Sequence, residues 1–252
     1  MSNSKNPETK INLIQQKIKL LQNYDKWQSV LAPWLRTELT YTSNSLEGNT
    51  LTLIETSMVI NDNRSVAGKN LREIYEATNH ANAFDFVQNN LINKKTQDLI
   101  EADLLDIHSL ILKNIDEFNG GKYRNVSVRI AGSNSIFPNP LKVPDLMEDV
   151  FVWLKNKDLK SLEEVLKIAI LTHLKIVKIH PFTDGNGRTA RLLMNTILMQ
   201  NNLPPINILP TNRKEYLASL EETTETETSK FIDFCLSQYD QNLDTYLETF
   251  QD

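Results

Sequence analysis

Residues 162–179 read Leu-Glu-Glu-Val-Leu-Lys-Ile-Ala-Ile-Leu-Thr-His-Leu-Lys-Ile-Val-Lys-Ile, and this stretch decides the fold. Apolar side chains fall on every side of the helix that it predicts, rather than along one stripe. A helix that is apolar all round is a buried one. We therefore expect a central helix, covered by other elements, that delivers the chain directly to His180.

The pattern remains helical on both sides of this stretch. Apolar residues three or four apart predict one helix over 10–30, and Pro33 is a favourable first-turn residue for a second. That second helix should end at Gly48, which can form a left-handed C-terminal cap. Further helices are expected at about 52–61, 70–92 and 101–115, from about 144, and at about 186–201 and 229–249.

One segment alternates as a β-strand does. Val126, Val128 and Ile130 alternate with polar residues, and a turn at 132–134 follows. The sequence therefore predicts an all-α fold, a helical bundle with one β-hairpin. Neither a P-loop pattern nor a G-x-G-x-x-G pattern occurs in it, which excludes the two commonest folds for nucleotide binding.

Composition narrows the class of protein. The chain has 252 residues, of which 40% are apolar and 23% charged, as in an ordinary globular protein. A net charge of −5 argues against a nucleic-acid partner, which would require a basic face. A single cysteine, Cys235, cannot form an internal disulfide, and no apolar run is long enough for a signal or a membrane span. We expect a cytoplasmic protein without membrane contact.

The chemistry is concentrated in residues 180–191, His-Pro-Phe-Thr-Asp-Gly-Asn-Gly-Arg-Thr-Ala-Arg. Gly185, Asn186 and Gly187 stand where the loop enters a helix, whose first N–H groups and dipole favour an anion such as phosphate. Arg188 and Arg191 are three residues apart, so both guanidinium groups can reach the same polyanion.

Two further side chains complete this set. Asp184 can supply the one carboxylate that a phosphate-bound Mg²⁺ needs. His180 is the nearby side chain whose ordinary pKa suits a general base at neutral pH. The sequence thus indicates a nucleotide-handling transferase.

This segment resembles the signature of the Fic family, H-x-F-x-(D/E)-G-N-G-R-x-x-R, at every specified position. The resemblance implies binding of ATP with Mg²⁺ and transfer of AMP to a protein hydroxyl. In that case His180 is the base, Asp184 holds the metal, and Asn186 contacts the α-phosphate. Gly187 keeps the pyrophosphate cradle open; the related Doc-type kinases carry Lys there, so the glycine favours adenylyl transfer.

An upstream segment resembles the inhibitory motif of the family, (S/T)-x-x-x-E-(G/N). It comprises Ser43, Glu47 and Gly48, and no other Glu-Gly or Glu-Asn pair occurs in the sequence. Ser43 and Glu47 are four residues apart and share a helix face. By resemblance, Glu47 pairs with Arg191 and occupies the place of the γ-phosphate, which would make this a member of the class with an N-terminal inhibitory helix.

Two weaker resemblances concern the target and the base. Gly121 to Arg124 and the hairpin resemble the target-positioning flap of the family, in which Val128, Arg129, Ile130 and Gly132 would offer a strand edge. Tyr216 lies where the family often has an adenine-contacting tyrosine.

The resulting hypothesis is an autoinhibited protein adenylyltransferase. We divide it into an N-terminal helical region, residues 1–100, with the inhibitory helix at about 33–48, and a catalytic core, residues 101–252, with the flap at about 121–138. Its partner would be a protein with an accessible hydroxyl, including the chain itself, and a homo-oligomer remains open. Another Fic-type transfer, removal of AMP, and a non-catalytic ATP-sensing or protein-binding module are the alternatives.

Overall fold

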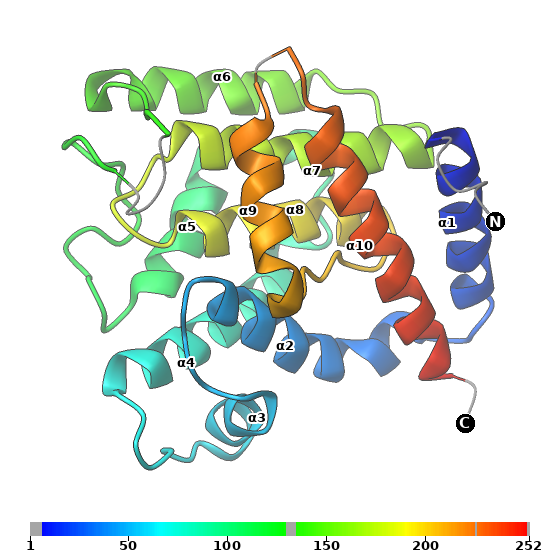
Figure 1. Cartoon of the computed structure of the whole chain (residues 1–252), viewed down its shortest axis with the longest axis horizontal. Helices are drawn as coiled ribbons and strands as arrows, with labels where there is room; N and C mark the ends of the chain where they lie inside the picture. The colour runs from blue at the N-terminus through cyan, green and yellow to red at the C-terminus, as the bar shows by residue number, and fades with distance from the viewer. Residues whose placement is uncertain (1–6, 130–134, 225, 251–252) are drawn as a thin grey trace.

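The computed structural model describes residues 7–129, 135–224 and 226–250, and within these ranges the fold is all-α, as predicted. Figure 1 shows the helices. They are α1 (Pro7–Gln22), α2 (Trp27–Leu46), α3 (Leu53–Asp62), α4 (Leu71–Phe86), α5 (Glu101–Leu112), α6 (Val143–Lys155), α7 (Leu162–Ile179), α8 (Asn186–Gln200), α9 (Arg213–Glu222) and α10 (Ser229–Glu248). A π-helical segment, η1 (Val87–Leu91), continues α4, and short 3₁₀ segments stand at η2 (Thr96–Asp98), η3 (Pro140–Lys142) and η4 (Pro210–Asn212).

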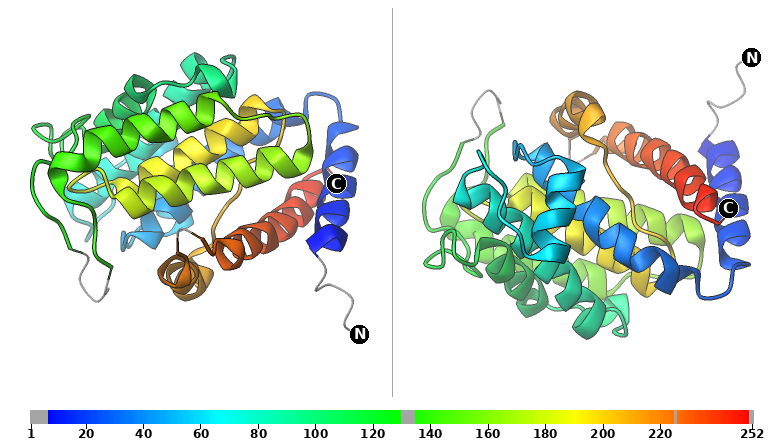
Figure 2. Two further views of the ribbon diagram at one scale, coloured as in Figure 1. Left: turned by 90° about the horizontal axis from the view of Figure 1, so that it is seen from above. Right: turned by 90° about the horizontal axis from the view of Figure 1, so that it is seen from below.

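Helices α7 and α8 pack against each other at the centre, and this pair fixes the position of the motif. The predicted central helix is found at the predicted residues, and a capping box between Ser161 and Glu164 begins it. Around the pair, α6 and α10 contact α7, while α2 and α5 contact α8. Helices α1 and α10, from the two ends of the chain, lie side by side (Figures 1 and 2).

The expected start of the second helix near Pro33 is wrong. Helix α2 begins at Trp27, after Lys26 takes the left-handed conformation with φ 54°, and it runs through Pro33 to Leu46. Trp27, Leu31 and Leu35 are buried, and the same stripe continues to Leu46. Burial of this stripe outweighs the single helical hydrogen bond that a proline removes. The single helix expected over 10–30 is also wrong, because α1 ends at Gln22 and the left-handed Lys26 separates it from α2.

The expected hairpin is not seen in the described part of the chain. No strand is present in residues 121–129 or 135–139, and Ile130 and Gly132 lie outside the described residues. A buried arginine, Arg124, stands between the two segments instead. Its Nη1 donates to Val126 O at 2.9 Å and its Nη2 to Pro138 O at 2.7 Å. Arg124 therefore holds together residues 121–129, the first stem of the flap, and residues 135–139, its second stem.

One buried apolar cluster runs through the described residues from Ile14 to Tyr246. A smaller cluster joins α3 and α4 through Val59, Ile60 and Ala77. The larger cluster draws on both sides of residue 100, and the division of the chain at that residue stays a prediction. Within the described ranges, no helix has both the length and the apolar character that crossing a membrane requires.

Candidate active site

The loop between α7 and α8 is held rigidly by its own side chains. His180 ends α7 in the left-handed conformation, φ 52°, and Gly185, φ 75°, precedes α8. Asn186 closes the loop, because its Oδ1 accepts from Phe182 N and its Nδ2 donates to Phe182 O, both at 2.9 Å. Phe182 is fully buried and packs in the core. The local sequence thus fixes where the polar side chains begin.

His108 of α5 joins this loop to the start of the flap at Gly121. Its Nδ1 accepts from the Gly121 N–H at 3.0 Å, so Nε2 carries the proton and donates to Asp184 O, also at 3.0 Å. The imidazole stacks on Phe182 with 3.5 Å between ring centres. Burial lowers the pKa of His108 to about 4, which keeps the ring neutral. It is a structural histidine.

Asp184 is surrounded by cations. Its Oδ1 accepts from Arg188 Nη2 at 3.1 Å and from the Gly185 N–H at 2.6 Å, and its Oδ2 accepts from Arg72 Nη2 at 2.5 Å. Burial alone would raise the pKa of Asp184, but Arg188, the Gly185 N–H and Arg72 together lower it. The carboxylate is therefore ionised at neutral pH.

Arg188 has spare donors although it is 2% exposed. Besides Asp184, its Nη1 lies 3.3 Å from Glu76 Oε1 on α4. Among the hydrogen bonds of the described residues, Nε and Nη1 donate none. A buried guanidinium that keeps unused N–H groups beside a helix N-terminus is suited to hold an anion.

Arg191 has its donors engaged by α2 and α9. Its Nη2 donates to Glu47 Oε1 at 2.7 Å and to Ser43 O at 2.9 Å, and its Nε donates to Ser43 Oγ at 3.0 Å. Nη1 donates to Tyr216 OH at 3.3 Å. The predicted partners Ser43, Glu47 and Arg191 thus meet, although Glu47 contacts one guanidinium nitrogen rather than both. Gly48, φ 99°, follows at the end of α2.

Glu47 covers Gly187. A Cβ built on this glycine would clash with Glu47 Oε1 and would lie 2.7 Å from Arg191 Nη1. The carboxylate therefore lies directly over the backbone of the first turn of α8, where unsatisfied N–H groups are found. It occupies space that an anionic ligand of this turn would need.

His180 is partly buried beneath the second stem of the flap. The ring of Phe137 stacks on it, with 4.2 Å between ring centres and 26° between planes. Burial lowers the pKa of His180 to about 4, and Arg124 acts in the same direction, while Glu47 and Asp184 oppose it. The imidazole is therefore neutral near pH 7, and in this arrangement it is a weaker base than an ordinary histidine.

Arg124 connects this histidine to both stems. Its Nε donates to His180 O at 2.7 Å, its backbone N–H donates to Pro181 O at 2.9 Å, and its Nη groups hold the stems as described. Its partners here are carbonyl groups, and burial lowers its pKa. Arg124 therefore fixes the stems relative to the histidine.

A cavity of about 940 Å³ is lined by Phe137 and by Ile179, the residue before His180. Phe137 and Pro138 form one wall, α6 and α7 form the floor, and Thr223 and Thr224 close the far side. Lys178 lines it too, although its Nζ donates to Leu220 O at 2.7 Å and Thr223 O at 2.8 Å. This is a mixed apolar and polar site next to the candidate base.

Not all predicted residues face an open space. Tyr216 is 3% exposed and lies behind Arg191, where its hydroxyl also meets His173 Nε2 at 3.0 Å. Both polar atoms of Asn186 are engaged by Phe182. Val128 and Arg129 lie in the first stem, and neither is among the described contacts of His180. The proposed roles of these residues in binding nucleotide or target stay predictions.

Sequence reasoning missed Arg72, Glu76, Arg124 and Phe137. Arg124 stands in a segment that the resemblance had singled out, but nothing in the sequence shows that its side chain turns inward. Arg72 and Glu76 lie on α4, over a hundred residues before the motif, and look like an ordinary i, i+4 surface pair.

Comparison with known proteins finds relatives of this chain. The profile of the "Fic/DOC family" matches residues 98–198. The chain is 36% identical over 207 residues to a protein named "Protein adenylyltransferase Fic" from Nematostella vectensis, which covers 82% of this chain and 48% of that protein. A protein of the same name from Aedes aegypti is also 36% identical, over 82% of this chain and 41% of its own length.

Residues 98–198 form a Fic/DOC family domain.

Solved structures of Fic proteins share the fold over nearly the whole chain. Fic-1 (aa134–508) from C. elegans superposes with a TM-score of 0.84 at 27% identity, covering 97% of this chain and 73% of that one. A Fic domain containing signaling protein from Bacteroides thetaiotaomicron gives 0.83 at 25% identity, over 95% of this chain and 96% of that one. The chain spans about half the length, or less, of the curated Fic relatives it matches.

Mg²⁺ is implied by the Fic resemblance, and the donor set fits one mode of binding. Among the described residues no group of three or more His, Cys, Asp or Glu side chains is arranged to hold a metal. One ionised carboxylate, Asp184, stands beside an arginine with unused donors. One carboxylate plus phosphate oxygens is a usual Mg²⁺ environment. The residues therefore fit a metal that arrives with a nucleotide.

Proposed function

We propose that this protein is an autoinhibited protein adenylyltransferase, which transfers AMP from ATP to a serine, threonine or tyrosine hydroxyl of a protein target or of the chain itself. The names of the curated relatives and the set of residues around His180 support this reaction. Mg²⁺ would be held by Asp184, where it would neutralise phosphate charge.

The observation that carries the proposal is the position of Glu47. Its carboxylate lies over Gly187 and binds Arg191, so it occupies both the backbone cradle and one guanidinium edge. A triphosphate that enters the first turn of α8 meets this negative charge. The phosphates can take the productive position only when Glu47 has left.

His180 would act on the attacking hydroxyl. Its neutral imidazole accepts the hydroxyl proton while the oxygen forms a bond to the α-phosphorus. The bond from that phosphorus to the oxygen bridging to the β-phosphate breaks, and pyrophosphate leaves. Phe137 covers one face of the ring and Arg124 fixes its backbone, so the base is held in one orientation.

The arginines would stabilise the phosphates. Arg188 keeps unused donors and is pinned by Asp184 and Glu76, so little reorganisation is needed when an anion arrives. Arg191 becomes available when Glu47 leaves. Asn186, Gly185 and Gly187 contribute the first turn of α8, whose N–H groups point outward to the ligand.

The flap would position the target. A protein segment that runs along residues 126–129 would place a hydroxyl above His180, and backbone hydrogen bonds along an extended edge need no particular target sequence. The cavity of 940 Å³ beside Phe137 would then receive the nucleoside end of ATP.

The test is the mass of the intact protein after incubation with ATP and Mg²⁺. Wild type, Glu47→Gly and the double variant Glu47→Gly/His180→Ala are compared, with Glu222→Gly, at the end of α9, as a matched control. We expect a gain of one AMP only in Glu47→Gly. The same proteins are incubated with α-labelled ATP and a cell lysate to detect a separate target.

Silence of Glu47→Gly in both assays, with ATP binding intact, would overturn the adenylyl transfer. Equal transfer by wild type and Glu47→Gly would retain the reaction but overturn the inhibitory role of Glu47. Transfer that persists in the double variant would overturn the assignment of His180 as the base.

A further inference from the structure

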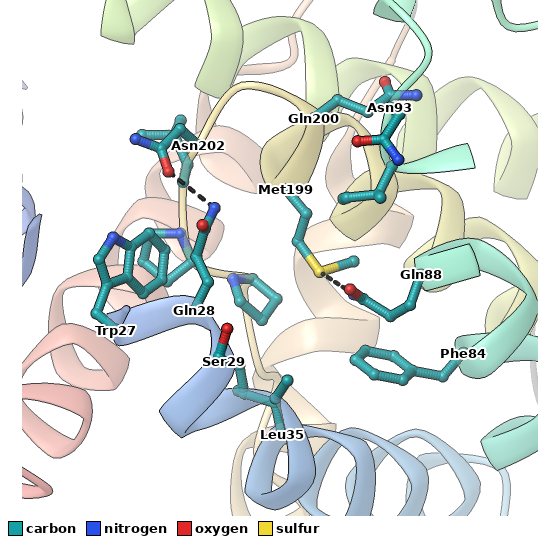
Figure 3. A pocket seen from close by; sticks show the side chains of 15 residues that line it. Trp27, Gln28, Ser29, Leu35, Phe84, Gln88, Asn93, Met199, Gln200 and Asn202 are labelled. Carbon is teal, nitrogen blue, oxygen red and sulfur yellow. Dashed lines mark hydrogen bonds between the residues drawn. The ribbon is translucent and has the colours of Figure 1, made fainter. Parts of the chain in front are cut away.

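A second cavity, of about 440 Å³, lies at the opposite end of α8 from the motif. Figure 3 shows its walls. Residues 27–35 of α2 form one side, the end of α4 with η1 forms another, and the end of α8 with the following segment to Pro205 forms the third. A volume of several hundred Å³ is the usual size of a small-molecule site.

The lining of this cavity is neutral. Of the described residues that form it, none has an ionisable side chain. Trp27, Phe84 and Met199 supply apolar surface, and side-chain amides supply the polar groups. The contrast with the motif is complete, because nothing here balances the charge of a phosphate or a carboxylate. A charged ligand would be desolvated here without a counter-charge.

The amides have bonding capacity left for a ligand. Gln88 Nε2 donates to Met199 Sδ at 3.1 Å, and a thioether is a weak acceptor. Gln28 Nε2 donates to Asn202 Oδ1 at 2.8 Å across the cavity mouth (Figure 3). Among the hydrogen bonds of the described residues, Gln88 Oε1, Gln28 Oε1 and Asn202 Nδ2 take part in none.

The backbone around the cavity is unusual in three places. The π-helical segment η1 places Gln88 on its wall, and π-helical turns often accompany functional sites. Asn202 takes the left-handed conformation with φ 58°. Pro204 and Pro205 stiffen the segment that follows α8. These three features shape the backbone that carries Gln88 and Asn202.

We propose that this cavity binds an uncharged, planar heterocycle that presents an N–H donor beside a C=O acceptor, as in a lactam or carboxamide ring. Such an edge matches a carboxamide side chain, which offers one donor and one acceptor side by side. Gln88 would exchange its thioether contact for a carbonyl oxygen of the ligand and would accept the ligand N–H at Oε1. Trp27, Phe84 and Met199 would contact the ring.

This site is independent of the adenylyl transfer proposed above. It lies on different elements from His180 and uses no residue of the motif. An uncharged nucleoside or a free carboxamide heterocycle would satisfy the same chemistry. A nucleotide would not, because its phosphate has no cation to meet in the lining.

The test measures binding of uracil, uridine and nicotinamide to the full chain by calorimetry and ligand-observed NMR, with saturating ATP and Mg²⁺ present to block the active site. The matched control ligand is 1,3-dimethyluracil, which keeps the ring but lacks N–H donors, and UMP adds only charge to uridine. We expect at least one of the three probes to bind. Where uracil binds, 1,3-dimethyluracil should bind tenfold more weakly. Uridine should bind more tightly than UMP.

Protein variants locate the site. Gln88→Leu removes an amide whose hydrogen bond in the described structure is to Met199, and Ser29→Trp fills the mouth from an exposed position on α2. Each should weaken binding at least tenfold, while Gln241→Leu, on the exposed side of α10, should not. Circular dichroism checks that each variant is folded.

Three results would overturn the proposal. The first is no binding of any probe at millimolar concentration to the folded protein. The second is binding that the two cavity variants leave unchanged. The third is tighter binding of UMP than of uridine, which would mean that a charged ligand is preferred.

Discussion

The two ends of α8 are built on opposite principles. At its N-terminal end Asp184, Arg188 and Arg191 meet charged partners from α2 and α4, and each of these charges depends on a residue far away in the sequence. At its C-terminal end Met199, Gln200 and Asn202 meet amides and apolar rings. Helix α8 therefore has a site suited to anions at one end and an uncharged site at the other.

The two ends therefore differ in how strongly they depend on the packing of other helices. A buried charge is costly unless its partner is in place, so the charged end is ordered only when α2, α4 and α8 have packed together. Neutral amides tolerate a missing partner far better. Perturbations of charge should accordingly act at one end and leave the other end unchanged.

A lower pH should have the largest effect, because the titrating histidines lie at the charged end. All four histidines surround the charged end, and burial lowers the pKa of His80 and His173 to about 3 and that of His108 and His180 to about 4. The unfolded chain binds these protons near pH 6.5. The stability is therefore complete above pH 6.5 and is lost as the pH falls toward 4, by up to about 1.4 kcal/mol per histidine and pH unit.

Urea unfolding between pH 7 and pH 5 measures this effect, because most carboxylates remain ionised in that window. We expect the free energy of unfolding to decrease steadily across it. A flat profile would show that the histidines are not held neutral.

Arg188→Met should come next in magnitude. It removes a buried guanidinium with unused donors, and loss of one such group from a catalytic site lowers the rate about 10²- to 10³-fold. Label transfer from ATP is measured in the Glu47→Gly background. The matched change at the neutral end, Gln200→Met, should leave the transfer rate within twofold, and a similar loss in both variants would contradict the division between the ends.

Arg72→Ala should act on the metal. Arg72 is more than half exposed and pairs with Asp184 Oδ2, the carboxylate expected to hold Mg²⁺. An exposed ion pair contributes about 0.2–1 kcal/mol. We expect the Mg²⁺ concentration for half-maximal transfer by Glu47→Gly to fall about two- to fivefold. Arg64→Ala, on an exposed loop, is the control; an unchanged Mg²⁺ requirement would mean that Arg72 does not compete.

Ser43→Ala should have the smallest effect. It deletes the acceptor of Arg191 Nε but leaves the contacts of Ser43 O and Glu47 in place. Losing this hydrogen bond costs about 1 kcal/mol. The contact of Glu47 with Arg191 should weaken, and basal transfer should rise about fivefold over wild type. Ser237→Ala is the matched serine control. A decrease would show that Ser43 supports transfer rather than restraint.

The sequence predicts local features of this molecule well. The central helix of residues 162–179 and the helix after Gly185 follow from apolar periodicity and a glycine at the boundary. It also places Glu47 four residues after Ser43, which brings both to one face of α2. These inferences need only neighbours in the chain.

What the sequence does not reveal depends on distant contacts. Pro33 lies inside a helix because Trp27 and Leu35 are buried by other elements, which no local rule contains. Arg124 replaces strand pairing at the flap stems because its side chain turns inward. The pairing of Arg72 with Asp184 joins residues 112 positions apart. Each of these three features depends on contacts that exist only in the packed structure.

Pro33 lies early in α2, far from the end of the helix that adjoins Glu47. The proline removes one hydrogen bond near the cavity at the start of the helix, and Glu47 stands fourteen residues further on, about 20 Å away along the axis. A tilt of α2 by about 5° at Pro33 moves its far end by about 2 Å. That displacement would be enough to separate Glu47 from Arg191, whose atoms lie 2.7 Å apart, so access for a triphosphate depends on how firmly the end of α2 is packed.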